Sequence, residues 1–244
     1  MKRSVAILGG TGGIGSEAVR AFSREGYDVC FTYFRAGQSA RDLANECGAK
    51  AHRLDLRQPA KLTEFVQSLP DRLDVLLVAA ASGVWRTLDE TSQRHLDFSY
   101  HVNVAAVLIA FQASLDRLSA AGGSMIVLTS PGSSFVVPGY ASIGMMKAAL
   151  EAFVRYAASE GGERGVRVNA VSAGLVETKA LNHLPDIDKH IAAITKQTPL
   201  QALVSPNDIA DAVLWLASSK SRMITGQILA VDGGYGLSAG RERG

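Results

Sequence analysis

The sequence predicts an α/β fold, built as a single doubly wound domain in which a seven-stranded parallel sheet carries helices on both faces. Two observations predict it. Short, near-continuous apolar runs alternate with helical patterns along the chain, and such runs suit parallel strands that are buried on both faces. Seven strands and about six helices then account for the 244 residues, without a repeat, a low-complexity linker or a second core.

Each expected strand is short and mostly aliphatic or β-branched: SVAIL (4–8), DVCFTY (28–33), AHRLDL (51–56), LDVLLVAA (73–80), SMIVLTS (124–130), VRVNAVS (166–172) and QILAVDGG (227–234). Helical patterns lie between them at 14–25, 38–47, 59–69, 88–118, 141–160 and 206–218. Alternation of this kind places consecutive strands parallel to one another. We therefore expect one domain over residues 1–240, followed by a tail at 241–244.

Residues 176–204 interrupt the alternation between the sixth strand and the last helix. They hold two prolines and scattered apolar residues, which are Leu181, Leu184, Ile187, Ile191 and Ile194. In this architecture ligands bind beyond the carboxyl ends of the strands, and a long excursion there can close over the site. We expect a lid over 176–204; a packed pair of surface helices is the alternative.

Composition and charge exclude several classes of function. The chain is 47% hydrophobic and 20% charged with a net charge of +2, so neither nucleic-acid binding nor a membrane-surface role is expected. No apolar run reaches the roughly 20 residues that span a bilayer, and no signal-peptide pattern is present. Cys30 and Cys47 lack metal-ligand spacing and are expected to be reduced thiols of a cytoplasmic protein. No metal site is expected, because His95, His101 and His183 form no metal-like group and are interpreted as structural or lid residues.

The first strand runs into LGGTGGIGSEAV, in which Gly9, Gly13 and Gly15 have the spacing G-x3-G-x-G. Glycine allows a positive φ and lets a phosphate approach the backbone closely, and the following helix offers free N–H groups and a positive dipole end to a pyrophosphate. A purely structural turn is the alternative, but the position between a first strand and a helix favours dinucleotide binding. The expected contacts are Gly9, Thr11, Gly12, Gly13, Ile14 and Gly15.

The end of the second strand selects between the two nicotinamide cofactors. An acidic residue there would accept hydrogen bonds from the adenosine ribose of NAD, but this chain has Tyr33, Phe34 and Arg35. Arg35 can pair with a 2′-phosphate through its planar fork, so we expect NADPH; a solvated surface arginine is the alternative. Asp55 and Leu56 follow the third strand and are placed to meet the adenine, unless Asp55 instead caps the next helix.

Together with four further motifs, these residues resemble the short-chain dehydrogenase/reductase family over nearly the whole chain. The motifs are HVNVAAVL with Asn103, LTS ending in Ser130, VNAVSAG with Ala173 in place of the usual proline, and ITGQILAVDGG at 224–234. Leu8 stands where the family usually has threonine. The resemblance implies a Rossmann fold, with cofactor contacts after the sixth strand from Gly174, Val176 and Thr178.

Two departures narrow the resemblance. The family's NNAG after the fourth strand is AAAS at 79–82, which leaves small residues such as Ala80 to line the nicotinamide pocket. The family's Tyr-x3-Lys pair is absent, since Ile143 stands four residues before Lys147, but Tyr140 stands seven residues before it. That spacing, with YASIGMMKAALEAFVRYAA and ASGVWR around it, resembles the enoyl-acyl-carrier-protein reductases of bacterial fatty acid biosynthesis, and most of all their type III members, which use NADPH.

Helix geometry explains why either spacing can serve. Four residues advance about 400° and seven about 700°, which is roughly 40° past one turn and roughly 20° short of two, so both positions share a face with Lys147. The longer spacing moves the tyrosine Cα from about 6 Å to about 10.5 Å along the axis. Pro138 and Gly139 predict that the helix starts there, which would place Tyr140 on the loop that leads into it. A phenol at that height suits a conjugated substrate, in which charge develops on the thioester oxygen.

The resemblance also implies roles for the two residues of this pair. Tyr140 would hydrogen-bond the thioester carbonyl, stabilise the developing enolate and help to supply a proton, directly or through water. Lys147 would bind the hydroxyls of the nicotinamide ribose, and its charge would lower the pKa of Tyr140. The alternatives are an aromatic packing residue at a helix start for Tyr140 and a surface lysine for Lys147.

Two further candidates stay open between a chemical and a structural role. Ser130 lies thirteen residues before Ile143, the family's usual serine-to-tyrosine spacing, and ten before Tyr140, where some enoyl reductases carry a second tyrosine. It could polarise a carbonyl or merely cap a strand end. Asn103 could hold a water in a proton relay or satisfy backbone groups in a kinked helix.

Three hypotheses about function follow. The first is an NADPH-dependent enoyl-thioester reductase, whose substrate is a small molecule or an acyl chain presented on acyl carrier protein. The second keeps the fold and cofactor but reduces a ketone in a biosynthetic pathway. The third is a non-catalytic relic that binds NADP(H), which the displaced tyrosine would favour. Relatives commonly form tetramers through the helices at 88–118 and 141–160, so the resemblance implies a homotetramer.

Overall fold

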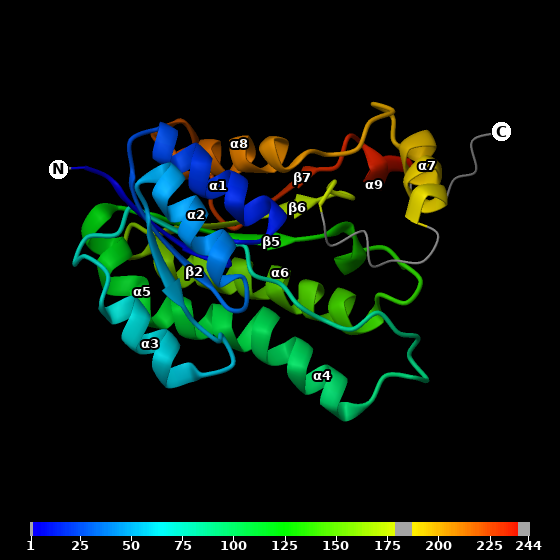
Figure 1. The fold of residues 1–244 in the computed structure, drawn as a ribbon, viewed down its shortest axis with the longest axis horizontal. Helices are drawn as coiled ribbons and strands as arrows, with labels where there is room; N and C mark the ends of the chain where they lie inside the picture. The colour runs from blue at the N-terminus through cyan, green and yellow to red at the C-terminus, as the bar shows by residue number, and fades with distance from the viewer. Residues whose placement is uncertain (1, 179–186, 239–244) are drawn as a thin grey trace.

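The computed structural model describes residues 2–178 and 187–238, in which seven parallel strands form one sheet in the order β3-β2-β1-β4-β5-β6-β7 (Figure 1). The strands are β1 (Ser4–Leu8), β2 (Asp28–Tyr33), β3 (Lys50–Arg53), β4 (Val75–Val78), β5 (Ser124–Thr129), β6 (Arg167–Ala173) and β7 (Ile228–Val231). Every pair of neighbouring strands is parallel. The predicted α/β doubly wound class is confirmed.

Helices connect the strands and cover both faces of the sheet. They are α1 (Gly13–Arg24), α2 (Gly37–Cys47), α3 (Pro59–Gln67), α4 (Gln93–Tyr100), α5 (Ala106–Ala121), α6 (Ala141–Gly162), α7 (Ile187–Gln197), α8 (Pro206–Ala217) and α9 (Tyr235–Ser238). In Figure 1, α1, α2 and α8 lie above the sheet, whereas α3, α5 and α6 lie below it. A crossover of this kind is required because parallel neighbours cannot be joined by a tight turn.

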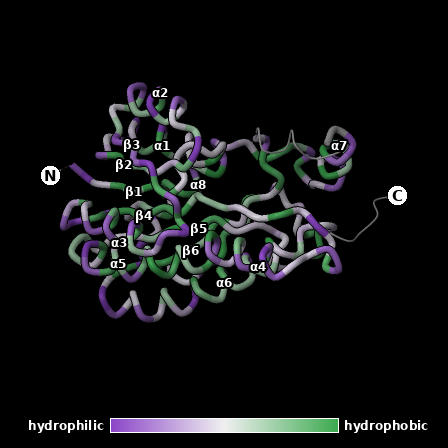
Figure 2. The backbone as a smooth tube through the Cα atoms, turned by 60° about the horizontal axis from the view of Figure 1, so that its bottom comes forward, coloured by the Kyte–Doolittle hydropathy of each residue, from purple (hydrophilic) through white to green (hydrophobic). Residues whose placement is uncertain are grey.

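The strands are apolar on both sides, as their sequences predict. In β1, Val5 and Ile7 pack into one cluster with α1, α2 and α8, while Ala6 and Leu8 pack into a second cluster with α3, α5 and α6. Successive side chains of a strand point to opposite faces, so a strand between two helical layers needs an apolar residue at every position. Figure 2 shows this hydrophobic interior, with hydrophilic turns on the outer sides of α2 and α3.

The order in which strands are added to the sheet reverses between β1 and β4, which are parallel neighbours although β2 and β3 intervene in the sequence. The loops after β1 and β4 therefore diverge to opposite sides and leave a crevice at the carboxyl ends of these strands, which is where such folds bind ligands. Ala79 and Ala80 both donate backbone hydrogen bonds to the Leu8 carbonyl, at 2.9 and 2.8 Å. These bonds fix the floor of the crevice.

The expected helix at 88–118 differs in its start and in its regularity. It begins at Gln93, because Ser92 caps it: the Ser92 hydroxyl accepts from the backbone N–H of His95, whose ring accepts from the Ser92 N–H. A π-helical turn at His101–Ala105 then separates α4 from α5. The strand expected at 51–56 is likewise shorter and ends at Arg53, before the turn at Asp55.

Segment Gln93–Ala121, with 29 residues, is long and apolar enough to cross a membrane by length and composition alone, and it is the one such helix in the described part of the chain. A helix that is buried in the core of a protein can have the same length and apolar composition. Here Ala106, Val107 and Ala110 lie in the apolar cluster beneath the sheet, so packing in the domain accounts for this side of the helix.

The excursion at 176–204 contains a helix, α7 (Ile187–Gln197), which packs on α9; a helix in this segment was expected only under the alternative of a packed pair of surface helices. The two ends of the excursion lie side by side, because Val176 forms a β-bridge with Val204 and the Glu177 N–H donates to the Val204 carbonyl at 3.1 Å. Figure 1 shows α7 projecting beyond the end of the sheet. The lid stays a prediction. Leu181, His183 and Leu184 and the tail at 241–244 lie outside the described residues.

Candidate active site

The loop after β1 has the backbone shape that the glycine motif predicts. Gly9 has a φ of 89°, and its carbonyl accepts from the Gly12 N–H at 3.3 Å. A Cβ on Gly15 would collide with the Gly9 carbonyl oxygen, so only glycine allows helix α1 to start this close to the loop. The Gly9 N–H donates to Thr32 Oγ1 at 3.1 Å, which ties the loop to β2.

The N-terminus of α1 is open toward the expected pyrophosphate. Its N-cap is Gly12, which provides no side-chain cap for the first N–H groups of the helix. Such groups, together with the positive end of the helix dipole, favour an anion. A Cβ on Gly13 would collide with the Thr178 side chain, so the segment after β6 lies directly against the loop. The residues present therefore fit a dinucleotide.

A cavity of about 440 Å³ lies at the carboxyl ends of β1 to β4. Seven of the expected cofactor contacts line it, which are Gly9, Thr11, Gly12, Arg35, Asp55, Leu56 and Ala80. The remaining expected contacts surround the loop or the far side of the crevice without lining this cavity: Gly13, Ile14, Gly15, Lys147, Gly174, Val176 and Thr178. Ser82, from the AAAS stretch expected at the nicotinamide pocket, also lines it, and so do Tyr33 and Phe98, which were not expected as contacts.

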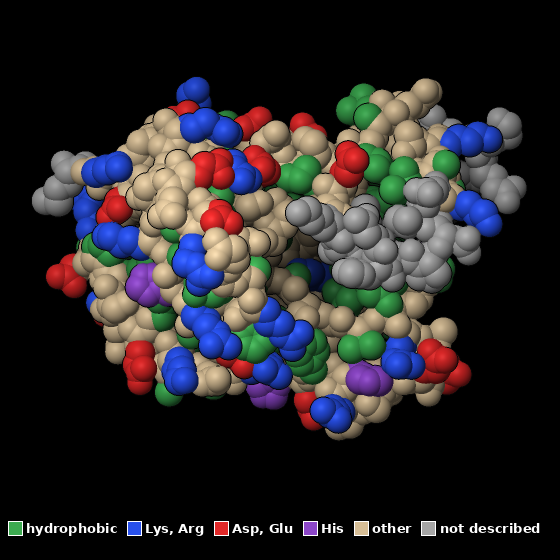
Figure 3. All heavy atoms as spheres, viewed as in Figure 1, with side chains coloured by type: hydrophobic (Ala, Val, Ile, Leu, Met, Phe, Trp, Pro, Cys, Tyr) green, Lys and Arg blue, Asp and Glu red, His purple; other side chains and the backbone are tan. Residues whose placement is uncertain are grey.

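Three arginines surround Phe34 at the adenosine end of this cavity, and we call them the basic rim. The guanidinium carbons of Arg35 and Arg57 lie 5.3 and 5.6 Å from the centre of the Phe34 ring, and Arg53 Nε donates to the Phe34 carbonyl at 3.3 Å. Figure 3 shows Lys and Arg side chains gathered beside a hollow on this face. The expected phosphate partner Arg35 is exposed and therefore able to meet an incoming phosphate.

Asp55 lines the cavity but is not free to act alone. Arg57 Nε and an outer guanidinium nitrogen bind the two oxygens of Asp55 at 2.9 and 2.7 Å, and the Arg57 N–H donates to Oδ1. These bonds hold the pKa of Asp55 below its usual range. The alternative in which Asp55 caps α3 is wrong, because the N-cap of α3 is Gln58. Arg57 was missed, although it stands only two residues after the predicted contact.

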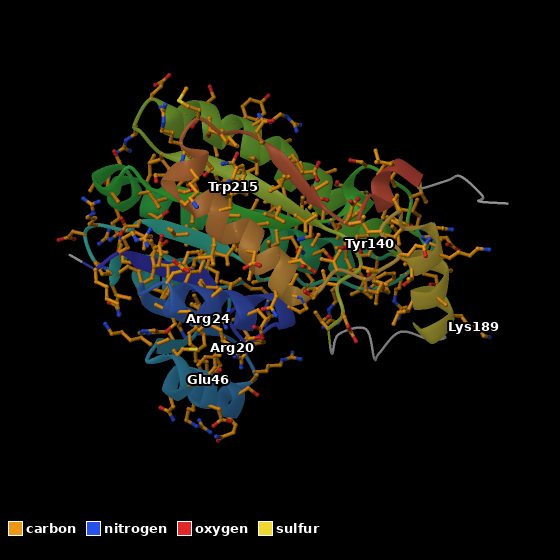
Figure 4. All side chains as sticks on the ribbon, turned by 90° about the horizontal axis from the view of Figure 1, so that it is seen from above. Arg20, Arg24, Glu46, Tyr140, Lys189 and Trp215 are labelled. Carbon is orange, nitrogen blue, oxygen red and sulfur yellow. The ribbon has the colours of Figure 1, made fainter. Side chains whose placement is uncertain are left out.

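Tyr140 is the N-cap residue of α6, as Pro138 and Gly139 predicted, and its hydroxyl lies 3.1 Å from Ser130 Oγ. The structure thus brings Ser130 and Tyr140 together at the end of β5. Burial raises the pKa of Tyr140, and the hydrogen bond with Ser130 only partly opposes this effect. The expectation that Lys147 lowers this pKa is wrong, because burial dominates and the phenol stays protonated. Figure 4 shows Tyr140 on the side from which α7 projects.

Residues 83–86, which follow β4, hold the start of α6 in place. Ser142 Oγ donates to the Val84 carbonyl at 2.8 Å, and the Arg86 N–H donates to the Gly139 carbonyl at 2.8 Å. Between these bonds, the Trp85 ring lies 4.9 Å from the Tyr140 ring, centre to centre. Trp85 belongs to the motif ASGVWR but was not predicted as a site residue, because the backbone bonds of its neighbours direct it onto the tyrosine.

Ile143 is buried and lies against Gly83, where a Cβ would collide with its side chain. The residue at the family's usual tyrosine position therefore serves packing in this chain. Its apolar side chain fills the space beneath the loop that carries Trp85. Tyr140, three residues earlier, carries the hydroxyl that Ile143 lacks.

Lys147 is not a surface lysine: it is 4% exposed, and its Nζ donates to the Leu128 carbonyl at 2.8 Å. Burial lowers the pKa of Lys147 to about 8, while the charge of Glu151 acts in the opposite direction. One of its three N–H donors is used in this bond. The other two are available to ribose hydroxyls.

Asn103 lies in the π-helical turn and binds backbone groups on two sides. Its Nδ2 donates to the carbonyls of Ser82 and Ser99, at 2.5 and 2.7 Å, and its Oδ1 accepts from the Ser82 N–H at 3.3 Å. These contacts support the structural alternative for Asn103, which joins the loop after β4 to the kinked helix. In residues 2–178 and 187–238, no group of three His, Cys, Asp or Glu side chains could hold a metal ion.

A family model described as enoyl-(acyl carrier protein) reductase matches residues 9–236. The chain is 29% identical to 1-cyclohexenylcarbonyl-CoA reductase of Streptomyces collinus over 98% of its own length and 89% of that protein. It is 30% identical to the NADH enoyl-(acyl-carrier-protein) reductase FabI of Rickettsia conorii, over 88% of this chain and 86% of the other. Among solved structures, BdcA in complex with NADPH superposes with a TM-score of 0.86 at 29% identity, covering 95% of this chain and 93% of that one.

Proposed function

Because the chain belongs to the short-chain dehydrogenase/reductase family, in its branch resembling enoyl-acyl-carrier-protein reductases, we propose that it reduces the 2,3 double bond of an enoyl thioester with NADPH. Membership of this family makes it an NAD(P)-dependent oxidoreductase. The observation that carries the proposal is the pairing of the Tyr140 hydroxyl with Ser130. It sets a protonated phenol at the end of β5, two helical turns before the buried Lys147.

The chain's own residues would bind the thioester carbonyl and help to supply the proton at C2. When bound, the reduced nicotinamide supplies a hydride, which is added at C3 of the substrate. Tyr140 donates a hydrogen bond to the thioester carbonyl and stabilises the negative charge that develops on its oxygen. A proton is then added at C2, from Tyr140 or through water. Ser130 orients the phenol, and Lys147 holds the ribose so that the nicotinamide faces the substrate.

NADPH rather than NADH is proposed because of the basic rim. Arg35 is exposed beside the cavity, and no acidic residue occupies the end of β2, where one would accept from the ribose of NAD. Arg57 is held by Asp55 and so contributes less free charge than Arg35. Among the relatives, the FabI protein is named for NADH and the BdcA structure contains NADPH, so the choice depends on this chain's own residues.

A substrate panel with NADPH tests the proposal. We expect oxidation of NADPH with a crotonyl thioester, little or none with aromatic ketones, and weaker activity with NADH. Activity on β-ketoacyl thioesters or ketones alone would overturn the enoyl assignment. A ketone reductase is the second candidate, because the hydroxyls of Ser130 and Tyr140 lie close enough to bind one carbonyl oxygen together.

Three further properties remain proposals on the same basis. The acyl group would be presented on acyl carrier protein in fatty acid biosynthesis, as in the branch that the chain resembles. The protein would be cytoplasmic. A homotetramer is favoured by exposed apolar side chains on α5 and α6, which are Leu108, Met145 and Tyr156. Light scattering would test the assembly directly.

A further inference from the structure

Three consecutive residues, two at the end of β5 and one just after it, each bind a side chain of α6 or of its N-cap residue. Two of these contacts, made by Leu128 and Ser130, hold the lysine and the tyrosine of the active site. The third lies between them: Thr129 Oγ1 donates to Glu151 Oε1 at 2.9 Å. Neither Thr129 nor Glu151 has a part in the proposed reaction, so this bond requires a separate explanation.

We propose that Glu151, held by Thr129, is a positioning residue that keeps the Lys147 ammonium charged inside the core and thereby available to the cofactor. The proposal rests on the proposed function in one respect, which is that Lys147 binds the nicotinamide ribose. It does not depend on which acyl substrate is reduced.

Burial creates the need for such a group. Lys147 is 4% exposed, and loss of hydration lowers its pKa to about 8 from an ordinary value of 10.5. Transfer of a charge out of water disfavours the charged form unless an opposite charge or a hydrogen bond compensates it. The Leu128 carbonyl provides a hydrogen bond, and the charge of Glu151 raises the pKa of Lys147 against the effect of burial.

Helix geometry places Glu151 close to Lys147. Residues four apart lie on one face of a helix, with Cβ atoms about 5–6 Å apart. None of the ion pairs formed among the described residues includes Lys147, so Glu151 acts on it through its electric field rather than by contact. A field of this kind is effective only while the carboxylate is held away from bulk water.

Thr129 supplies that restraint. Its side chain is 3% exposed, and it is the neighbour in sequence of Leu128, whose carbonyl binds Lys147. The bond from Thr129 therefore draws the Glu151 carboxylate toward the strand, on the side where the lysine is bound. Without the bond, the half-buried Glu151 would turn toward solvent, where water screens its charge.

Few other charges face Lys147 from the elements packed against α6. β5 and the short helix at 131–133 carry no titratable side chain, and β6 carries only Arg167, whose guanidinium binds carbonyls at the opposite end of the sheet. On α5, Asp116 and Arg117 lie near the C-terminal end. Tyr140 is the phenol bound to Ser130. The titratable groups on α4 and the π-helical turn are mostly exposed; they are Arg94, His95, Asp97, Tyr100 and His101.

Binding of NADPH as a function of pH tests the proposal without any acyl substrate. Fluorescence titrations between neutral pH and about pH 10 would compare the wild type with Glu151→Gln, which keeps the acceptor for Thr129 and removes the charge. For the wild type we expect the affinity to fall as pH rises through about 8, where Lys147 loses its proton. For Glu151→Gln we expect the same fall at a pH lower by about one unit.

Two more variants complete the comparison. Thr129→Val keeps the Glu151 carboxylate but removes the hydrogen bond that restrains it, so the pH at which NADPH affinity falls should shift in the same direction by a smaller amount. This variant provides the test if Glu151→Gln does not fold. Glu160→Gln, an exposed position on α6, should match the wild type. A merely structural role would lower the affinity equally at every pH and leave the midpoint in place. An unchanged midpoint in both Glu151→Gln and Thr129→Val, or an equal shift in Glu160→Gln, would overturn the proposal.

Discussion

Replacing Tyr140 with phenylalanine removes one oxygen atom from the proposed active site and little else. The phenylalanine ring keeps the contact with Trp85, whose ring centre lies 4.9 Å away. Ser130 Oγ loses one partner, but it is only partly buried and can turn to water, so the stability cost is below about 1 kcal/mol. A change in turnover would therefore report on the hydroxyl itself.

The expected loss follows from the role of that hydroxyl. Removal of one donor from a site that stabilises a developing oxyanion typically lowers kcat by about 10²–10³, or roughly 2.7–4 kcal/mol. Burial raises the pKa of Tyr140, which keeps the phenol protonated and able to donate at neutral pH. We expect Tyr140→Phe to lose activity to this extent with a crotonyl thioester while its affinity for NADPH changes little.

The assay measures kcat, the dissociation constant of NADPH and the melting temperature of each variant. Tyr156→Phe is a matched control, because Tyr156 lies on the same helix and is 73% exposed. Ser130→Ala should lose less than Tyr140→Phe, about 10-fold, since Ser130 orients the phenol and does not itself stabilise the developing oxyanion. If Tyr140→Phe folds, binds NADPH and turns over at the wild-type rate, the assignment of Tyr140 is refuted.

Three other predictions concern the cofactor and the core. Arg35→Ala should weaken the binding of NADPH by about 10- to 100-fold and that of NADH by much less, since a bond to a phosphate is charge-assisted. Titration with both cofactors checks this, with the exposed Arg41→Ala as the control. An equal loss of affinity for both cofactors would contradict it. Asn103→Leu leaves one buried and two partly buried backbone groups without their partner and should lower the unfolding free energy by about 2–4 kcal/mol in urea. An unchanged value would show that Asn103 does not hold the loop. Lys147→Met tests the lowered pKa of Lys147. Without cofactor, the folded wild type binds fewer protons than the unfolded chain between about pH 8 and pH 10.5, so its stability relative to the variant should rise by about 1 kcal/mol per pH unit in that window. A stability difference that stays constant over this range would contradict the lowered pKa.

The sequence predicted the strands and the glycine loop because both depend on local rules. Apolar runs mark strands buried on two faces, and Gly9, with a φ of 89°, marks the turn before α1. The start of α6 after Gly139 was predicted for the same reason. The pairing of Arg57 with Asp55 was not, since a side chain's partner depends on where the turn after β3 directs it. The π-helical turn was not predicted either, because the backbone groups that bind Asn103 belong partly to a loop 21 residues away in the sequence.

The displaced tyrosine shows how much of a catalytic pattern depends on neighbours. Ile143, at the family's usual position, is packed against Gly83, so a tyrosine there would need space that the loop after β4 already fills. The same loop brings Trp85 onto Tyr140 and bonds the backbone of Gly139, which fixes the phenol just before the helix. A change in that loop and a change in the tyrosine's position therefore depend on one another. Spacing in the sequence identifies the lysine's face of the helix, but only the loop determines which hydroxyl can occupy it.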